Sequence, residues 1–207
     1  MSSINKNILV IDIGIGNIQS VVNSINYLGY SCQIGNSINE INNANIIILP
    51  GVGAFGEAIN QLHKFEIFDV LKNKLQENNV YFLGICLGMQ ILFDKSFEHG
   101  EHEGLGLIKG TVEKISFSKR LPHVGWNDIE IKSNSILFKG MTECKDFYFD
   151  HSYSVLCSQK TVSSETQYDG QNVISSVENG TIFGVQFHPE KSQFLGIKLI
   201  ENFLKRS

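Results

Sequence analysis

The sequence predicts an α/β fold in which a doubly wound, mostly parallel sheet carries antiparallel additions in the C-terminal half. In the first half, short runs of apolar residues alternate with segments whose apolar residues recur at helical spacing. Glycine-containing segments follow three of these runs, at the strand ends where such sheets bind ligands. The second half instead contains extended segments separated by turns, which is typical of antiparallel pairing.

The chain begins with a predicted strand, turn and helix. Residues 8–11 are all apolar, as expected for a strand that is covered on both faces. Asn17 is a plausible N-cap for the following amphipathic helix, and Gly29 is its expected stop. The remaining elements of the first half are a strand at 46–49 ended by Pro50, a helix around 68–75, a strand at 80–85 and a helix that begins at 87–93.

The second half is predicted to be rich in strands, with a helix at its end. The pattern that indicates them is a succession of short extended segments between turn residues, followed by apolar residues at helical spacing. These segments are 111–117, 128–132, 147–155 and 181–187, and the closing helix is 192–205.

Length and charge narrow the possible functions. A chain of 207 residues favours one domain, spanning 1–207. Lys plus Arg number 17 and Asp plus Glu number 21, so a net charge of -4 gives no basic surface for nucleic acid. The apolar run at 8–11 is too short for a signal peptide, and no run is long enough to span a membrane. We therefore expect a cytoplasmic protein that binds neither nucleic acid nor a membrane.

The segment GICLG at 84–88 has the form G-x-C-x-G between a predicted strand and a predicted helix. This is the thiol version of a nucleophile elbow, in which flanking glycines allow a sharp turn and close neighbours. A helix N-terminus directed at the Cys86 sulfur would favour the thiolate over the thiol. The alternative is a buried cysteine between two turn glycines, which the strand–turn–helix context disfavours.

The segment VQFHPE at 185–190 supplies a candidate base. Pro189 stops the preceding strand, so His188 and Glu190 should lie at its exposed end. A Cys–His pair needs a third group to hold the imidazole in the useful tautomer, and Glu190 can do this. The expected catalytic triad is therefore Cys86, His188 and Glu190, although sequence spacing alone does not bring His188 to Cys86.

A third glycine-rich segment, PGVG at 50–53, is a candidate oxyanion site. Attack of a thiolate on an amide places negative charge on the carbonyl oxygen, and a preorganised N–H donor stabilises it by ~3 kcal/mol. Leu87 N–H is one expected donor, and a peptide N–H from Gly51, Val52 or Gly53 is the other. On its own, a segment of this kind is more often a simple turn than an oxyanion site.

Together these segments resemble the class I, or triad-type, glutamine amidotransferases. The Pro-Gly loop, G-x-C-x-G and late His-Pro-Glu occur in the same order, and the set is specific. Within that class, the sequence is similar to the family of glutaminase subunits of imidazole glycerol phosphate synthases. The motifs that carry this resemblance are DIGIGN at 12–17, PGVGAF at 50–55, GICLGMQ at 84–90, GLGLIKG at 104–110, PHVGWN at 122–127, YFDHSY at 148–153 and FGVQFHPEKS at 183–192.

The resemblance implies hydrolysis of L-glutamine to L-glutamate and ammonia, without a metal or an organic cofactor. Gly53 and Gln90 match positions at which the family binds glutamine. The ammonia would pass to a (β/α)8-barrel cyclase subunit in a heterodimer, for imidazole glycerol phosphate and AICAR formation in histidine biosynthesis. Residues in motifs that face this cyclase in the family are Asn17, Trp126, Tyr148 and Lys191.

Three other functions stay open at this point. A related glutaminase could supply ammonia to a sugar-amidation pathway for surface polysaccharides, and the triad does not distinguish this partner from the cyclase. A cysteine peptidase or γ-glutamyl hydrolase would leave PHVGWN and PGVGAF unexplained. A non-catalytic assembly module would leave the intact Cys, His and Glu unexplained.

Overall fold

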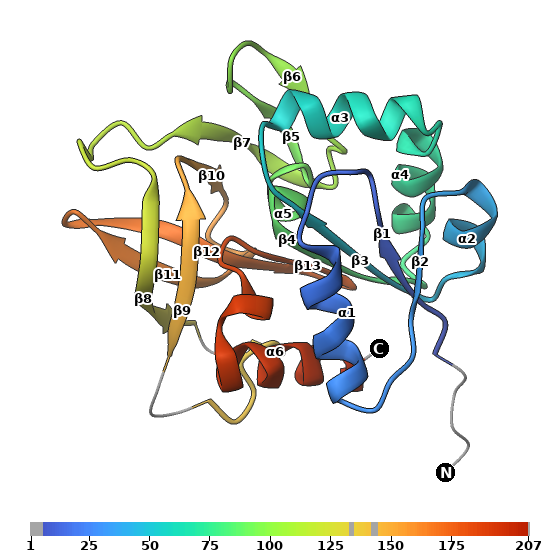
Figure 1. Ribbon diagram of the computed structural model, residues 1–207. Coiled ribbons are helices and arrows are strands. Elements are labelled where there is room, and N and C mark those ends of the chain that lie inside the picture. The colour runs from blue at the N-terminus through green and yellow to red at the C-terminus, as the bar shows by residue number, and fades with distance from the viewer. Residues whose placement is uncertain (1–5, 133–134, 142–144, 207) are drawn as a thin grey trace.

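The computed structural model describes residues 6–132, 135–141 and 145–206. Within these residues, nine strands form the main sheet in the order β2-β1-β3-β4-β13-β12-β11-β8-β9 (Figure 1). Its strands are β1 Ile8–Ile11, β2 Gln33–Gly35, β3 Ile46–Gly51, β4 Tyr81–Cys86, β8 His123–Ile131, β9 Asp146–His151, β11 Val162–Tyr168, β12 Gln171–Asn179 and β13 Ile182–Val185.

The main sheet confirms the predicted fold class and corrects the position of one strand. Strands β2, β1, β3, β4 and β13 run parallel, whereas β12, β11, β8 and β9 pair antiparallel. The prediction placed 181–187 among the antiparallel additions. Strand β13 instead pairs parallel with β4, with Val185 opposite Ile85. The residues that follow β13 therefore emerge at the same edge of the sheet as Cys86.

A smaller sheet packs beside the first, in the order β10-β7-β5-β6. The helix expected from 87 to 93 is wrong beyond Gln90, because Phe93 already begins the first strand of this sheet. The single extended segment expected at 147–155 is split at Ser152 between the two sheets. The strands of the smaller sheet are β5 Phe93–Ser96, β6 His102–Glu103, β7 Ile108–Lys114 and β10 Tyr153–Cys157.

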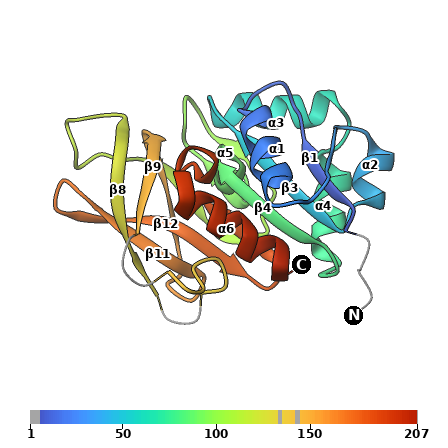
Figure 2. The same ribbon diagram turned by 60° about the horizontal axis from the view of Figure 1, so that its bottom comes forward.

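Helices cover both faces of the parallel strands. Helices α1 and α6 pack on one face, and α3 and α4 lie on the other (Figure 2). The side chains of β1 alternate between these two cores, with Ile8 and Val10 facing α1 and α6 while Leu9 and Ile11 face α3 and α4. The helices are α1 Ile18–Tyr27, α2 Ile38–Asn43, α3 Phe55–Lys64, α4 Phe68–Gln76, α5 Leu87–Gln90, the 3-10 helix η1 Pro189–Lys191 and α6 Gln193–Arg206.

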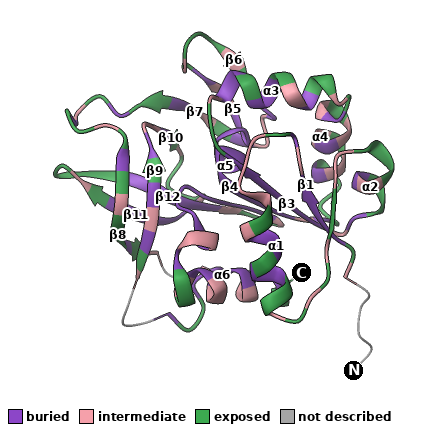
Figure 3. Cartoon of the chain, in the orientation of Figure 1, coloured by how far each residue is buried: buried purple, intermediate pink, exposed green. Residues whose placement is uncertain are grey.

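This two-sided packing explains the continuous apolar runs in the sequence. Every residue of β1 and β3 is buried, as Figure 3 shows by colour. At the ends of α1, Gly29 adopts φ +81 as expected of a helix stop, but Asn17 makes no side-chain cap hydrogen bond. None of the helices in the described ranges is long and apolar enough to cross a membrane.

Candidate active site

Cys86 occupies a strained turn between β4 and α5. Its φ of 54° and ψ of -107° lie in a region that non-glycine residues rarely adopt. A Cβ on Gly84 would lie 2.2 Å from the Gly88 carbonyl oxygen, and one on Gly88 would lie 1.9 Å from the Leu49 carbonyl oxygen. Both glycines are therefore required, because the turn brings backbone against backbone where no side chain fits.

His188 and Glu190 form a buried pair at the end of β13. His188 Nδ1 lies 2.8 Å from Glu190 Oε1, and the two side chains are only 2% and 1% exposed. A carboxylate can only accept here, so the proton resides on Nδ1 when the ring is neutral. Nε2 is buried and makes no hydrogen bond of ordinary geometry in the described part of the chain.

The surroundings of His188 favour its protonated form. Burial alone would lower the pKa of this imidazole, but interactions with Cys86 and Glu190 outweigh it and raise the pKa to about 10. Cys86 therefore lies close enough to His188 for their charges to interact. The sequence left this proximity open, and the parallel pairing of β13 with β4 supplies it.

The helix that begins after Cys86 is shorter than predicted. Helix α5 spans only Leu87–Gln90, a single turn, so few peptide dipoles align behind the sulfur. The larger local charge is the protonated His188 imidazole, whose raised pKa depends in part on Cys86 itself. The positively charged group that interacts with Cys86 is therefore His188.

A cavity of about 230 Å³ opens beside the sulfur. Of the predicted glutamine and oxyanion residues, it is lined by Val52, Gly53, Leu87 and Gln90. Gly51 lies just behind the wall, because β3 continues through Pro50 to pair Gly51 with Cys86. The other lining residues, which the sequence did not indicate as ligand-binding, are Glu98, Pro122, Asp150, His151, Ser152 and Tyr153.

Two sequence motifs could have indicated some of the residues near the sulfur that were not predicted. The motif YFDHSY was assigned to the partner surface, yet its second half turns into the cavity at the junction of β9 and β10. The Asp150 carbonyl oxygen lies 4.0 Å from Cys86 Sγ. Gln186 precedes His188 by two residues, and its Nε2 lies 3.6 Å from the same sulfur. Residues next to a recognised catalytic motif are therefore candidates by position alone.

Three of the four predicted interface residues lie together. The rings of Trp126 and Tyr148 meet edge to face at 6.2 Å, and Lys191 Nζ lies 5.3 Å from the Tyr148 ring centre. Asn17 lies at the start of α1, and this helix contacts η1, which carries Lys191. Trp126 is 50% exposed and also borders a larger cavity of about 1010 Å³ between α1, α6 and β8.

Comparison with known proteins places this site in a family. The model for "Glutamine amidotransferase class-I" matches residues 9–206. The chain belongs to the class-I glutamine amidotransferases. It is therefore a glutaminase by family, as the sequence predicted.

Within the amidotransferases, the chain is similar to the HisH subunits of imidazole glycerol phosphate synthase and belongs with them. It is 40% identical to that subunit from Aquifex aeolicus (strain VF5) over 201 residues, covering 96% of each chain. It is 41% identical to the same subunit from Caldanaerobacter subterraneus subsp. tengcongensis over 194 residues, covering 94% of this chain and 95% of the relative. The predicted subfamily is thereby confirmed.

Solved structures of amidotransferases share the fold at much lower identity. A structure of PurLQS from Thermotoga maritima superposes with a TM-score of 0.74 at 20% identity, covering 98% of this chain and 99% of that one. A structure described as glutamine amidotransferase gives a TM-score of 0.73 at 17% identity, covering 95% and 97%. At these identities the likeness concerns the arrangement of strands and helices only.

Proposed function

We propose that this chain hydrolyses L-glutamine with Cys86 as nucleophile, His188 as acid and base, and Glu190 as the residue that orients His188. The observation that carries the proposal is the strained Cys86 turn, which holds a thiol beside a buried His–Glu pair at the wall of a small cavity. A base oriented by a carboxylate and next to a nucleophile is the arrangement that acyl-transfer catalysis needs.

The reaction follows from these positions. The Cys86 thiolate attacks the side-chain amide of glutamine, and the carbonyl oxygen becomes an oxyanion. In this proposal the N–H of Leu87 donates to this oxygen, and an N–H from Val52 or Gly53 joins it once the loop peptide is turned inward, each worth ~3 kcal/mol. His188 gives its proton to the departing ammonia, leaving a γ-glutamyl thioester, and then takes a proton from the water that hydrolyses it.

The ammonia then passes to a (β/α)8-barrel cyclase, which forms imidazole glycerol phosphate and AICAR in histidine biosynthesis in the cytoplasm. Support comes from the relatives, which are named as subunits of that synthase. The half-exposed Trp126 and the adjacent Tyr148 form the kind of aromatic surface that protein interfaces favour, and Lys191 lies beside them. We treat 1–207 as one glutaminase domain, since the main sheet draws strands from residue 8 to residue 185.

The partner is also proposed to switch the glutaminase on. Gly53 adopts φ +100, and Val52 is 40% exposed, so the peptide between them is the adjustable part of the oxyanion site. Rotation of this peptide would exchange a repelling carbonyl for an N–H donor, worth ~10²–10³ in rate. The isolated chain should therefore hydrolyse glutamine slowly.

The test is to mix the chain with a barrel cyclase and measure glutamate release with and without the cyclase's acceptor substrate. We expect the chain alone to release glutamate slowly, and we expect the cyclase with its acceptor substrate to increase this rate strongly. Activation by a sugar-modifying synthase, and by no cyclase, would overturn the assigned partner. Full turnover by the chain alone would overturn the switch but leave the triad intact.

A further inference from the structure

Polar side chains connect Cys86 to the opposite wall of the cavity. Gln186 and Gln90 are 0% and 5% exposed. Gln186 Nε2 lies 3.6 Å from Cys86 Sγ, and Gln90 Nε2 lies 3.0 Å from Gln186 Oε1 and 3.1 Å from the Tyr153 carbonyl oxygen. The sulfur is thus the end of a continuous series of buried contacts.

The direction of each hydrogen bond in this series is fixed by one backbone atom. The Tyr153 carbonyl oxygen can only accept, so the Gln90 atom that contacts it must be the amide nitrogen. That same nitrogen contacts Gln186, whose facing atom must then be its oxygen. The remaining end of the Gln186 side chain, directed at the Cys86 sulfur, is therefore the N–H donor.

A histidine pair holds the same carbonyl from the other side. His151 Nδ1 lies 2.8 Å from the Tyr153 oxygen and must donate to it. His151 Nε2 then accepts from His123 Nδ1 at 3.0 Å, and His123 Nε2 accepts from Asn127 Nδ2 at 3.2 Å. The Tyr153 carbonyl oxygen thus accepts hydrogen bonds from both Gln90 and His151, and these two bonds fix the orientation of the Gln90 amide.

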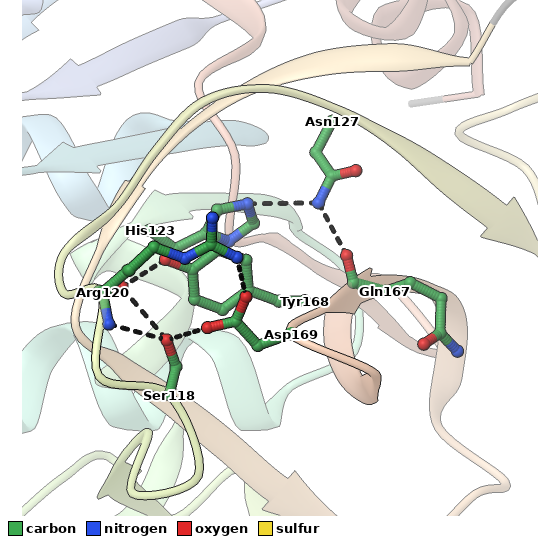
Figure 4. A network of polar contacts seen from close by, with 7 residues as sticks. All are labelled: Ser118, Arg120, His123, Asn127, Gln167, Tyr168 and Asp169. Carbon is green, nitrogen blue, oxygen red and sulfur yellow. Dashed lines mark hydrogen bonds and ion pairs between the residues drawn. The ribbon is translucent and has the colours of Figure 1, made fainter.

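The outer end of this series is anchored in the β8 and β11 strands. Figure 4 shows His123 beside the Tyr168 ring, with Asn127 reaching from His123 to the Gln167 carbonyl. The His123 and Tyr168 ring centres are 4.0 Å apart, and the Phe149 ring stacks on His123 at 4.6 Å. Rings packed in this way hold the imidazole plane, and with it the bond to His151.

We propose that Gln186 is a positioning residue whose side-chain N–H holds the Cys86 sulfur as a thiolate, in an orientation fixed by Gln90 and the Tyr153 carbonyl. This inference rests on the proposed role of Cys86 as nucleophile. His188 must leave the sulfur to protonate ammonia, whereas the neutral Gln186 amide keeps its proton throughout the reaction. Gln186 therefore supplies a donor to the sulfur that takes no part in the proton transfers of His188.

The test measures the rate at which iodoacetamide alkylates Cys86, at several pH values, by mass spectrometry of the peptide that contains it. Gln186→Glu keeps an oxygen for Gln90 but removes the donor to sulfur, and Gln186→Met removes the donor without adding an acid. We expect both variants to be alkylated about tenfold more slowly at pH 7, since a hydrogen bond to a charged group is lost. The deficit should shrink above about pH 9, where a free thiol ionises.

Steady-state kinetics on the same variants give a second readout. In Gln186→Glu, kcat should fall about tenfold while KM for glutamine stays near the wild-type value, because the Gln90 contact is kept. Gln33→Glu is the matched control, since Gln33 is exposed on the edge strand β2. Wild-type alkylation profiles in both Gln186 variants would overturn the inference. Alkylation of Cys86 that left glutaminase activity intact would instead overturn the proposed function.

Discussion

His188 and the His123–His151 pair are both buried, yet their surroundings push their pKa values in opposite directions. His188 has the Glu190 carboxylate at 2.8 Å and Cys86 nearby, and its pKa rises to about 10. His123 and His151 bond to each other and to neutral groups, and burial lowers their pKa values to about 4 and about 3. The distant Asp169 only partly offsets this for His123.

Burial alone does not decide the role of a histidine, because its interaction partners set its charge state. A charged imidazole next to a thiolate can deliver a proton. A neutral imidazole in a hydrogen-bonded series donates from one ring nitrogen and accepts at the other. His151 also feels the charge on His188, which further disfavours a proton on it. The two sites therefore remain in different charge states at neutral pH.

The largest expected effect separates the two sites by catalysis. His188→Asn should lower the glutaminase rate by about 10⁴-fold, because proton transfer to ammonia and from water is lost. His123→Phe should lower it by only about tenfold, since it disturbs the pocket wall through His151 and Gln90. Glutamate release at saturating glutamine measures both, and equal losses would end the distinction between them.

A smaller loss is expected when the carboxylate that distinguishes the sites is removed. Glu190→Gln should lower the glutaminase rate by about 10²-fold, because the imidazole keeps a hydrogen-bond partner but loses its counter-charge. The pKa of His188 should fall, because the Glu190 charge no longer opposes the effect of burial, and NMR of the imidazole C–H protons follows this change. A larger rate loss in Glu190→Gln than in His188→Asn would mean that the two roles are misassigned.

The free energy of unfolding should depend on pH in opposite directions for the two sites. His123 and His151 have folded pKa values below the ordinary 6.5, so their contribution is present above pH 6.5 and is lost as the pH falls toward about 4 and about 3. Down to pH 4.5 this loss is about 2 kcal/mol per histidine. The contribution of His188, whose folded pKa is raised, is present below pH 6.5 and is lost as the pH rises toward about 10.

Urea unfolding at pH 7 and pH 5 tests this, with His123→Phe as the variant. Phenylalanine keeps the stacking on Phe149 and Tyr168 but cannot gain a proton. The variant should lose less stability than the wild type between these two pH values. If the variant and the wild type lose the same free energy of unfolding between pH 7 and pH 5, His123 does not cause the loss.

The smallest effect is expected where the network reaches solvent. Arg120 pairs with Asp169 next to Ser118, but its side chain is 79% exposed (Figure 4). Exposed ion pairs contribute little because water and salt screen them. Arg120→Gln should leave the urea midpoint and the glutaminase rate unchanged, and a clear loss of either would extend the positioning network to the surface.

Three of the parallel strands could be predicted because continuous apolar runs indicate strands that are buried on both faces. Strands β1, β3 and β4 are buried on both faces and consist mainly of apolar residues. The sequence patterns did not predict strands β11 and β12. These two strands bury serines that satisfy one another, such as Ser163 with Ser176 and Ser164 with Ser175, each at 2.6 Å between hydroxyl oxygens. A polar sequence of this kind is indistinguishable from a loop until the cross-strand partner is known.

For the site, the triad could be predicted from short motifs, since each of its members lies in one. Gln186 and His151 could not, because their roles depend on neighbours far away in the chain. Gln186 gains its orientation from Gln90, 96 residues earlier, and His151 accepts a hydrogen bond from His123, 28 residues earlier. The proximity of His188 to Cys86 could not be predicted for the same reason, because it depends on the pairing of β13 with β4.

The insertion of β13 between β4 and β12 has a consequence for synthesis on the ribosome. Gln186 and Cys86 are 100 residues apart, so at ~5–20 residues per second the nucleophile emerges about 5–20 s before its partners. During that interval the edge of β4 that later receives β13 is open, and the thiol has neither base nor amide beside it. The nascent chain therefore has no assembled triad until β13 and the residues that follow it have emerged from the ribosome.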